Sequence, residues 1–303
     1  MTTTRATVPA PSASGRLSDR TFAVLLTLPA LALLAVIVCY PLLSALFTSL
    51  FEQSLILPGR AFVGLRNFAD VLGTDFLPVL RNTAVFTVFA TVLPFLVGFA
   101  LALALNVGVR GQSVLRGVFL MPWVVPGVVV SFVWLWIFNA SYGLLNGFLV
   151  RTGVVDVPIA WLADPLWATV AIIVAKSWAS FPWMMVMLLA GLQTVPKDLH
   201  EAAALDGAGI VKRFRHVTLP HLRGIIGIVL LLEFIWNFQH FDIIYVLTGG
   251  GPAGTTTTFA VSVYNTAFKG FDLGHAGAMG ALWMAVLTVL VVLYIRSSER
   301  KSS

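Results

Sequence analysis

Six long apolar runs dominate this sequence and limit what the chain can fold into. They cover residues 22–47, 79–107, 114–138, 165–192, 225–247 and 276–295. A run of about 18 or more apolar residues is long enough to cross the roughly 30 Å hydrocarbon core of a bilayer as a helix. The composition agrees, because 58% of the 303 residues are hydrophobic and only 11% are charged. The sequence therefore predicts an all-α integral membrane protein with six transmembrane helices.

Short polar segments flank these runs. Residues 1–21 are polar and rich in Thr, Ser, Ala and Pro, which indicates a disordered tail. The first run is too long for a cleaved signal peptide, so we interpret it as the first span. A transmembrane domain is thus expected over residues 22–298, with a second short tail at 299–303. Cys39 is the only cysteine, which excludes an intrachain disulfide.

The positive charges are distributed unevenly among the loops. Most of the 19 Lys and Arg residues lie in the two termini and in the second and fourth loops. Cytoplasmic loops of membrane proteins carry such an excess. Both termini are therefore predicted to be cytoplasmic, and loops 52–80, 139–164 and 248–276 to face outward. The net charge of +6 reflects this topology and does not indicate a nucleic-acid partner.

No catalytic or metal-binding motif is recognisable in the sequence. The patterns H-x-x-x-H, C-x-x-C and G-x-S-x-G are all missing. The segment GGGPAGT at residues 249–255 lacks the lysine of a phosphate-binding loop, and we interpret it as a turn. No catalytic, metal-binding or cofactor-binding residue is expected, and the chain is not expected to hydrolyse ATP by itself.

Two of the predicted spans carry polar or aromatic residues at helical spacing. The fifth run places three of them at i, i+4 and i+7, as does the fourth: Glu233, Asn237 and His240, and Lys176, Ser180 and Trp183. Polar groups inside a membrane are costly and therefore indicate function or pairing. The two faces predict either a path for a polar, sugar-like substrate or a buried Lys176–Glu233 ion pair with Asn237 cross-linking helices. These two interpretations do not exclude each other.

The loop at residues 194–222, between the fourth and fifth runs, is the longest inward segment. Pro196 is suited to a helix start, and Asp198 with Glu201 resembles a capping box. Three alanines follow, so the predicted helix has little bulk. Gly207 and Gly209 are expected to supply the positive φ angles that end it.

A second short basic helix is expected over residues 210–216. The whole loop could dock onto another protein. It could equally lie on anionic lipid through Lys212, Arg213 and Arg215.

The same loop carries a longer motif. Glu201, Ala202, Ala203, Asp206 and Gly207 are followed by Val217, Leu219 and Pro220. This pattern, E-A-A-x-x-x-G and then hydrophobic-x-Leu-Pro, resembles the signature of the integral-membrane permease subunits of bacterial ABC importers. FVGLRNF at 62–68, SWASFPWM at 177–184 and FDIIYVLTGGGPAGTTT at 241–257 resemble its carbohydrate-uptake branch, which includes permeases for maltose, lactose and glycerol phosphate.

The resemblance implies a type I ABC importer permease fold in the bacterial plasma membrane. The short helix is then a coupling helix, with Glu201, Ala202, Ala203, Asp206, Gly207 and Pro220 at the contact with an ATPase. Lys176, Ser180, Trp183, Glu233, Asn237 and His240 are then expected along the substrate path. The implied partners are a second homologous permease, two ABC ATPase subunits, an extracytoplasmic binding protein and membrane lipid. ATP and Mg²⁺ belong to the ATPase, and no cofactor is expected in this chain.

Three alternatives stay open at this point. The same machinery could carry glycerol-3-phosphate or a phosphodiester, because Lys176 lies in the expected path. An ion-coupled secondary transporter could use Glu233, His240 and Asp242 as a proton relay. A membrane enzyme with an unrecognised site is the third alternative.

Overall fold

The structure of this chain is a computed structural model that describes residues 19–74, 76–107 and 111–299. The chain divides between Phe47 and Thr48 into two compact units. The predicted tails, 1–21 and 299–303, lie outside the described residues except at their inner ends. There, residues 19–21 and Glu299 are helical.

The first unit is one long apolar helix. It consists of α1 (Asp19–Leu34), the π-helical turn η1 (Ala35–Cys39) and α2 (Tyr40–Thr48), whose last residue, Thr48, begins the second unit. Residues Phe22–Thr48 are long and apolar enough to cross a membrane, as the first run predicts.

The second unit begins with a small hairpin that the all-α prediction did not include. Strands β1 (Phe51–Gln53) and β2 (Arg60–Phe62) pair antiparallel, with Phe51 opposite Phe62. The two rings meet edge to face at 5.4 Å, and Arg60 lies over the Phe51 ring. A cross-strand aromatic pair of this kind stabilises a short hairpin. The side chain of Asn67, in α3 (Arg66–Gly73), donates to the carbonyls of Ser49 and Phe51 and holds the hairpin to this helix.

Two long helices form the centre of the second unit. They are α4 (Phe76–Asn106) and α8 (Pro165–Gln193), and both are long and apolar enough to span a membrane. Gly98 of α4 lies against the α8 backbone, where an added Cβ would be 2.8 Å from the Phe181 carbonyl oxygen and 2.9 Å from the Met185 nitrogen. Small residues allow membrane helices to approach this closely. Gly98 therefore sets the spacing between α4 and α8.

The third predicted span, residues 114–138, is not a single straight helix. It consists of α5 (Gln112–Val124) and α6 (Gly127–Ile137), which are bent by 92° relative to each other. Pro126 supplies the break, because a residue before proline is forced into an extended conformation, and Val125 has ψ 130°. Five helices of the described chain are long and apolar enough to cross a membrane, and this bent pair brings the number to six if it is counted as one span.

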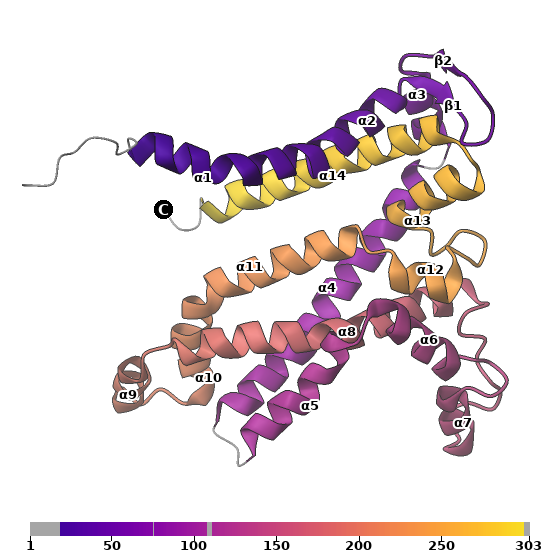
Figure 1. Cartoon of the computed structure of the whole chain (residues 1–303). Coiled ribbons are helices and arrows are strands. Elements are labelled where there is room, and N and C mark those ends of the chain that lie inside the picture. The colour runs from indigo at the N-terminus through magenta and orange to yellow at the C-terminus, as the bar shows by residue number, and fades with distance from the viewer. Residues whose placement is uncertain (1–18, 75, 108–110, 300–303) are drawn as a thin grey trace, which may run out of the picture. The chain divides into compact units, whose positions relative to one another are not determined.

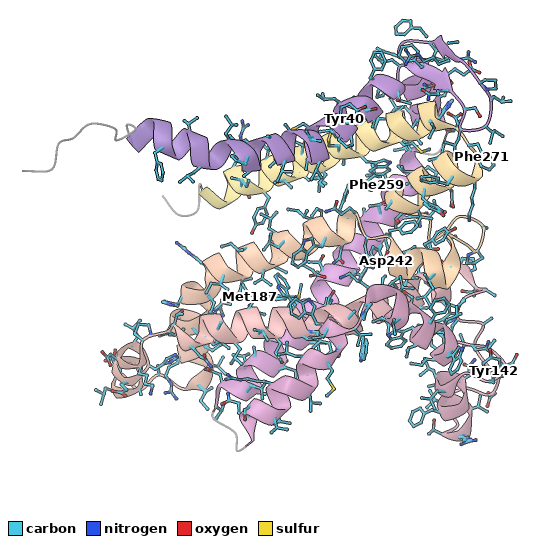
Figure 2. All side chains as sticks on the ribbon, viewed as in Figure 1. Tyr40, Tyr142, Met187, Asp242, Phe259 and Phe271 are labelled. Carbon is cyan, nitrogen blue, oxygen red and sulfur yellow. The ribbon has the colours of Figure 1, made fainter. Side chains whose placement is uncertain are left out.

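The fifth predicted span also differs from a simple helix. α10 (Ile210–Arg213), the π-helical turn η2 (Phe214–Thr218) and α11 (Leu219–Phe238) form one continuous helix, Ile210–Phe238. The expected separate basic helix at 210–216 is therefore wrong, since these residues are the start of the spanning helix. The π-turn accommodates Pro220, which has no N–H for a hydrogen bond to the preceding turn. The chain breaks after Phe238, and Asp242 begins α12 (Asp242–Thr248) (Figure 2).

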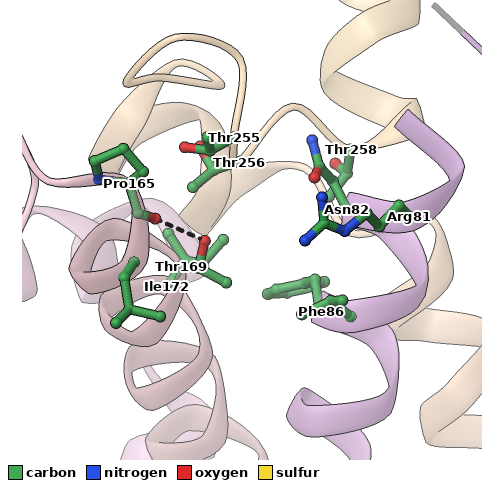
Figure 3. Close-up of a pocket in the computed structure, with 11 residues that line it drawn as sticks. Arg81, Asn82, Phe86, Pro165, Thr169, Ile172, Thr255, Thr256 and Thr258 are labelled. Carbon is green, nitrogen blue, oxygen red and sulfur yellow. Dashed lines mark hydrogen bonds between the residues drawn. The ribbon is translucent and has the colours of Figure 1, made fainter. Parts of the chain in front are cut away.

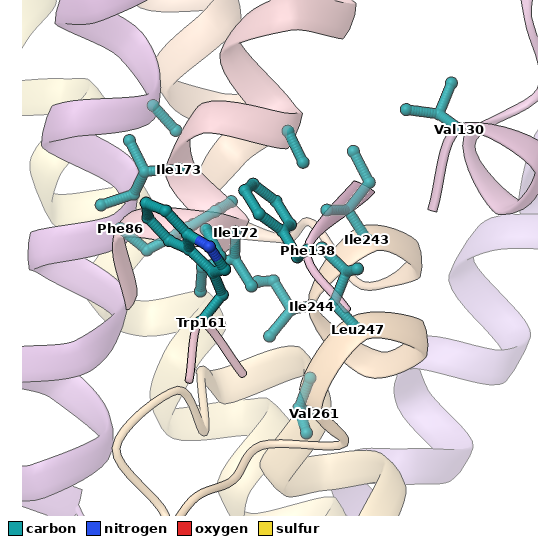
Figure 4. Packing of buried hydrophobic residues seen from close by; sticks show 13 residues of the cluster. Phe86, Val130, Phe138, Trp161, Ile172, Ile173, Ile243, Ile244, Leu247 and Val261 are labelled. Carbon is teal, nitrogen blue, oxygen red and sulfur yellow. The ribbon is translucent and has the colours of Figure 1, made fainter. Parts of the chain in front are cut away.

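The remaining helices are α7 (Leu144–Arg151), α9 (Lys197–Leu205), α13 (Phe259–Tyr264), η3 (Asn265–Lys269) and α14 (Leu273–Glu299). Within the second unit, α9 lies at one end of α8, and α6 and α12 lie at the other (Figure 1). At that second end a buried cluster joins α4, α6, α8, α12 and α13. Phe86, Ile172 and Ile244 are among its members (Figure 4). A second cluster, which includes Met184 and Leu222, fills the space among α4, α8 and α11 nearer α9.

We expect Gly98→Ala to destabilise the fold by about 1–3 kcal/mol, because the new methyl group forces α4 away from α8. The thermal unfolding midpoint of the purified protein in detergent measures this effect. Gly224→Ala in α11 is the matched control, since an added Cβ there meets no atom within 4 Å. An equal midpoint for both variants would contradict the close packing at Gly98.

Candidate functional site

A buried ion pair joins α8 and α11. Lys176 Nζ lies 3.0 Å from Glu233 Oε1, and the two residues are only 8% and 2% exposed. Lys176 also donates a hydrogen bond to Ser180 Oγ, one helical turn along α8. The i, i+4 spacing thus brings Lys176 and Ser180 together as the sequence predicts. Glu233 reaches them from the neighbouring helix.

This pair is costly to assemble and more costly to break. Desolvating two charges consumes most of their mutual attraction, and the Ser180 hydroxyl replaces part of the lost hydration of the ammonium group. Removing one partner leaves the other charge buried and unpaired. The structure therefore contains the Lys176–Glu233 ion pair that one of the two interpretations predicts.

Asn237 turns toward α4 rather than toward α8. Its Nδ2 donates to the Ala90 carbonyl at 2.9 Å and to Thr91 Oγ1 at 3.0 Å. The NH₂ group of Asn237 thus cross-links α11 to α4, as the second interpretation predicts. Its Oδ1 is buried and accepts no hydrogen bond from any described residue.

His240 does not extend the Glu233 and Asn237 face, because α11 ends at Phe238. It lies in the break before α12, where its ring stacks on Phe86 at 6.1 Å between centroids. Its Nε2 is buried and has no hydrogen-bond partner among the described residues. The i+7 placement of His240 is therefore wrong. The run Asn237-Phe-Gln-His-Phe-Asp242, polar at four of six positions, was the sequence signal for a broken helix.

Trp183 lies apart from the ion pair, nearer the α9 end of α8. It is half-buried and meets Trp236 of α11 edge to face, with ring centroids 4.9 Å apart. The two indoles give α8 and α11 a second contact beyond the ion pair.

Several buried polar atoms around this region have no hydrogen-bond partner among the described residues. Besides the two atoms on Asn237 and His240, they include Thr87 Oγ1 of α4 and Ser177 Oγ of α8. Buried polar groups in folded proteins are almost always bonded. Sequence reasoning missed Thr87, Thr91 and Ser177, because single hydroxyls within apolar runs give no pattern. We call Lys176, Ser180, Glu233, Asn237, His240 and these three hydroxyl residues the polar cluster.

The second predicted site, on α9, is a short exposed helix with an ordered end. The N–H of Ala208 donates to the Ala203 carbonyl at 2.9 Å and that of Gly207 to the Ala204 carbonyl at 3.0 Å. Together with φ +76° at Gly207, these bonds form a Schellman motif. Gly207 therefore ends the helix as predicted. Gly209 has φ −66° and precedes α10 instead, so its predicted positive φ is wrong.

The start of α9 also differs from the prediction. Pro196 is the residue before the helix, and Asp198 lies within the first turn without making a side-chain cap. The predicted capping box is therefore not formed, although the Asp198 carboxylate still lies at the positive end of the helix.

The outer face of α9 offers small and apolar groups. Glu201, Ala202, Asp206 and Gly207 are exposed, and Ala203 is half-buried. Leu205 is 90% exposed, and Ile210 and Val211, just beyond the helix, are also largely exposed. Pro220 lies farther along, exposed in the first turn of α11. Such a surface fits a protein partner better than water.

Polar and ionisable residues buried among membrane-length helices are typical of membrane transport proteins. A family model described as "binding-protein-dependent transport system inner membrane component" matches residues 94–302. The trehalose/maltose transport system permease protein MalF of Thermococcus litoralis is 37% identical over 273 residues, 90% of this chain and 92% of that protein. The sulfoquinovosyl glycerol transport system permease protein SmoG of Agrobacterium fabrum is 36% identical over 94% of this chain and 92% of its own.

The fold has a solved counterpart. A chain in the crystal structure of a bacterial ABC transporter involved in the import of the acidic polysaccharide alginate superimposes with a TM-score of 0.81. The match covers 94% of this chain and 97% of that chain, at 20% identity. The chain therefore belongs to the binding-protein-dependent transport system inner membrane component family. The predicted permease fold is confirmed, as is the prediction that the chain is a transport subunit and not an enzyme.

We expect Lys176→Met to destabilise the protein by roughly 3–5 kcal/mol, because Glu233 is left buried and unpaired. Adding Glu233→Leu should recover most of that loss. Thermal unfolding of the two variants measures both steps. The exposed pair Arg66–Asp70, at 3.8 Å, serves as the control, and Arg66→Met should change the stability by about 0–1 kcal/mol. A double variant no more stable than Lys176→Met would contradict this account of the pair.

Proposed function

We propose that this chain forms part of the membrane pathway of an ATP-driven importer that carries a sugar, either an oligosaccharide or a glycoside. Its family depends on binding proteins, and the two relatives described above are named for trehalose/maltose and for sulfoquinovosyl glycerol. An extracytoplasmic binding protein delivers the substrate in this proposal. The polar cluster supports it, since hydroxyl-rich ligands need hydrogen-bonding groups in an otherwise apolar bundle.

The complete importer contains four further subunits in this proposal. A second homologous permease completes the pathway, and two ABC ATPase subunits bind ATP and Mg²⁺. The binding protein is the fourth. The complex lies in the bacterial plasma membrane, surrounded by lipid, with both termini of this chain cytoplasmic. The excess of Lys and Arg in the loop that holds α9 supports this orientation.

The observation that carries the proposal is the exposed surface of α9. Its alanines allow close approach, its Schellman motif fixes its end, and Leu205 presents an uncovered apolar side chain. Lipid contact alone does not account for the exposed acids Glu201 and Asp206, which anionic headgroups would repel. The docking interpretation is therefore favoured over the lipid interpretation.

The mechanism follows from the connection of α9 to the bundle. ATP binding closes the ATPase dimer and moves α9 with it. This motion switches the bundle between inward-open and outward-open states, which is coupling between distant sites through a two-state element.

The predicted substrate path keeps all six residues, but they differ in role. Lys176 donates to both Ser180 and Glu233. These three side chains therefore bind a sugar through the hydrogen-bonding positions that this contact leaves unused. The free acceptor of Asn237 and the free Nε2 of His240 contribute hydrogen bonds. Trp183 contributes an aromatic face.

The alternative cargo, glycerol-3-phosphate or a phosphodiester, was suggested by Lys176. That charge is neutralised by Glu233 at 3.0 Å, so Lys176 gives it no support. Another alternative was an ion-coupled secondary transporter with Glu233, His240 and Asp242 as a proton relay. The importer is favoured over it, because the family of this chain depends on binding proteins.

Purification of the tagged chain from its native membrane tests the proposal directly. We expect an ABC ATPase and a second permease to accompany it, and the preparation to hydrolyse ATP. Mass spectrometry and a phosphate-release assay provide the two readouts. Recovery of the chain alone, with no ATPase bound, would overturn the proposed function.

We expect Gly207→Val to reduce ATP hydrolysis stimulated by the substrate-loaded binding protein several-fold. A β-branched residue pays about 1–2 kcal/mol in the left-handed conformation that Gly207 adopts. Gly209→Val is the matched control, because Gly209 has an ordinary φ and no atom lies within 4 Å of an added Cβ at either glycine. Equal stimulation in the two variants would show that the end of α9 is not part of the coupling.

A further inference from the structure

A cavity of about 280 Å³ lies at the end of the bundle opposite α9. It is lined by residues 81–86 in the second and third turns of α4, by the first turns of α8 up to Ile172, and by the loop between α12 and α13 (Figure 3). This is the end at which the three loops predicted to face outward lie. Its size is at the lower limit of the roughly 300–1,000 Å³ of ligand sites, which suits one sugar ring rather than a chain of them.

The polar lining of the cavity has an unusual charge composition. Arg81 of α4 is the only charged residue in it, and neither Asp nor Glu lines it. None of the ion pairs among the described residues includes Arg81, which is largely exposed. A guanidinium group is a strong donor to carboxylate, sulfonate and phosphate oxygens. The cavity therefore carries one uncompensated positive charge.

The wall formed by the loop adds hydroxyl groups. Thr255, Thr256 and Thr258 all line the cavity. Thr258 is only 2% exposed, and its Oγ1 is buried without a hydrogen-bond partner among the described residues. A buried hydroxyl of this kind is costly unless a ligand or water bonds to it.

This wall is fixed in place before any ligand arrives. Asn82 Nδ2, on α4, donates to the carbonyls of Gly254 at 2.9 Å and Thr257 at 3.2 Å. Thr83 Oγ1 accepts from the Phe259 N–H at 3.0 Å, just beyond the loop. A wall tied to α4 at three points loses little entropy when a ligand binds.

The floor of the cavity is apolar and connects to the polar cluster. Phe86 and Ile172 form it, and the Phe86 ring stacks on His240 beneath. An apolar floor under hydroxyl-bearing walls suits the two kinds of surface on a sugar ring. Phe86 thus contacts both the cavity and His240, whose Nε2 is unbonded among the described residues.

We propose that this cavity is an outer subsite for a polyhydroxylated molecule that bears an acidic group. Arg81 binds the acidic group, and Phe86 and Ile172 contact the C–H face. The unbonded Thr258 hydroxyl binds a sugar hydroxyl, whereas the hydroxyls of Thr255 and Thr256 already donate to loop carbonyls. The subsite rests on the proposed function, because that function makes this end of the bundle the entry. The subsite specifies the substrate class as an acidic sugar. Lys176 gives no such indication, because Glu233 neutralises its charge.

Ligand binding to the purified complex in lipid nanodiscs, without the binding protein, tests this subsite. Saturation-transfer NMR titrations compare sodium D-glucuronate with D-glucose, which differ at one carbon in the acidic group. We expect glucuronate to bind about tenfold more tightly than glucose, the worth of a hydrogen bond to a charged group. Arg81→Gln should remove this difference, and Arg81→Lys should keep part of it. Thr258→Val should weaken both ligands about fivefold.

Arg151→Gln is the matched control. Arg151 is also an exposed arginine of an outward loop but does not line the cavity, so its removal should leave both affinities unchanged. A third titration with sn-glycerol 3-phosphate identifies the source of the acidic group. Tighter binding than glucuronate, lost in Arg81→Gln, supports the subsite with a phosphate ester as its ligand.

Two results would overturn the subsite. One is equal affinity for glucuronate and glucose in the wild-type complex. The other is unchanged glucuronate binding in Arg81→Gln with reduced stimulation of ATP hydrolysis by the binding protein, which would make Arg81 a docking residue for that protein. ATP hydrolysis by the same preparations separates these results from a failure of the proposed function, which would leave no co-purified ATPase activity at all.

Discussion

The absence of water in the hydrocarbon core is the constraint on which the rest of this structure depends. Each backbone polar group must be satisfied within the protein there, so spans are helices, and irregular backbone is tolerated only where protein covers it. The two broken spans of this chain obey this rule together. α6 and α12, the segments that follow the breaks, pack against each other. Val130, Phe138, Ile243 and Ile244 bury the contact in one hydrophobic cluster. Each broken span thereby covers part of the other.

The same constraint explains what the sequence could predict. Hydrophobic length alone locates the spans, and the helical spacing of Lys176 and Ser180 predicts their contact on one face of α8. Pro196, the three alanines and Gly207 predict the short loop helix α9. These features are local, because each depends on residues within a few turns of one another.

The features that sequence reasoning missed depend on distant contacts. The break after Phe238 removes His240 from the α11 face, and only the stacking against Phe86 of α4 shows where the ring lies. From the sequence, the Asn237 side chain could have pointed toward α4 or toward α8. Its two hydrogen bonds to α4 show that it points toward α4. The hairpin at 51–62 has strands too short to show a period. The fusion of the basic segment to α11 depends on a π-turn that no simple pattern predicts.

The continuity of the helix from Ile210 to Phe238 has a mechanical consequence. It contains 29 residues, which at about 1.5 Å per residue makes a rod of roughly 43 Å. One end of this helix follows α9 after four residues, and the other end carries Glu233 and Asn237. The connection to α9 is the segment 206–209, whose first part is held by the Schellman motif at Gly207. In the proposed importer, any motion of α9 therefore reaches the buried ion pair through one helix, and the π-turn at Phe214–Thr218 is the place along it where bending is expected.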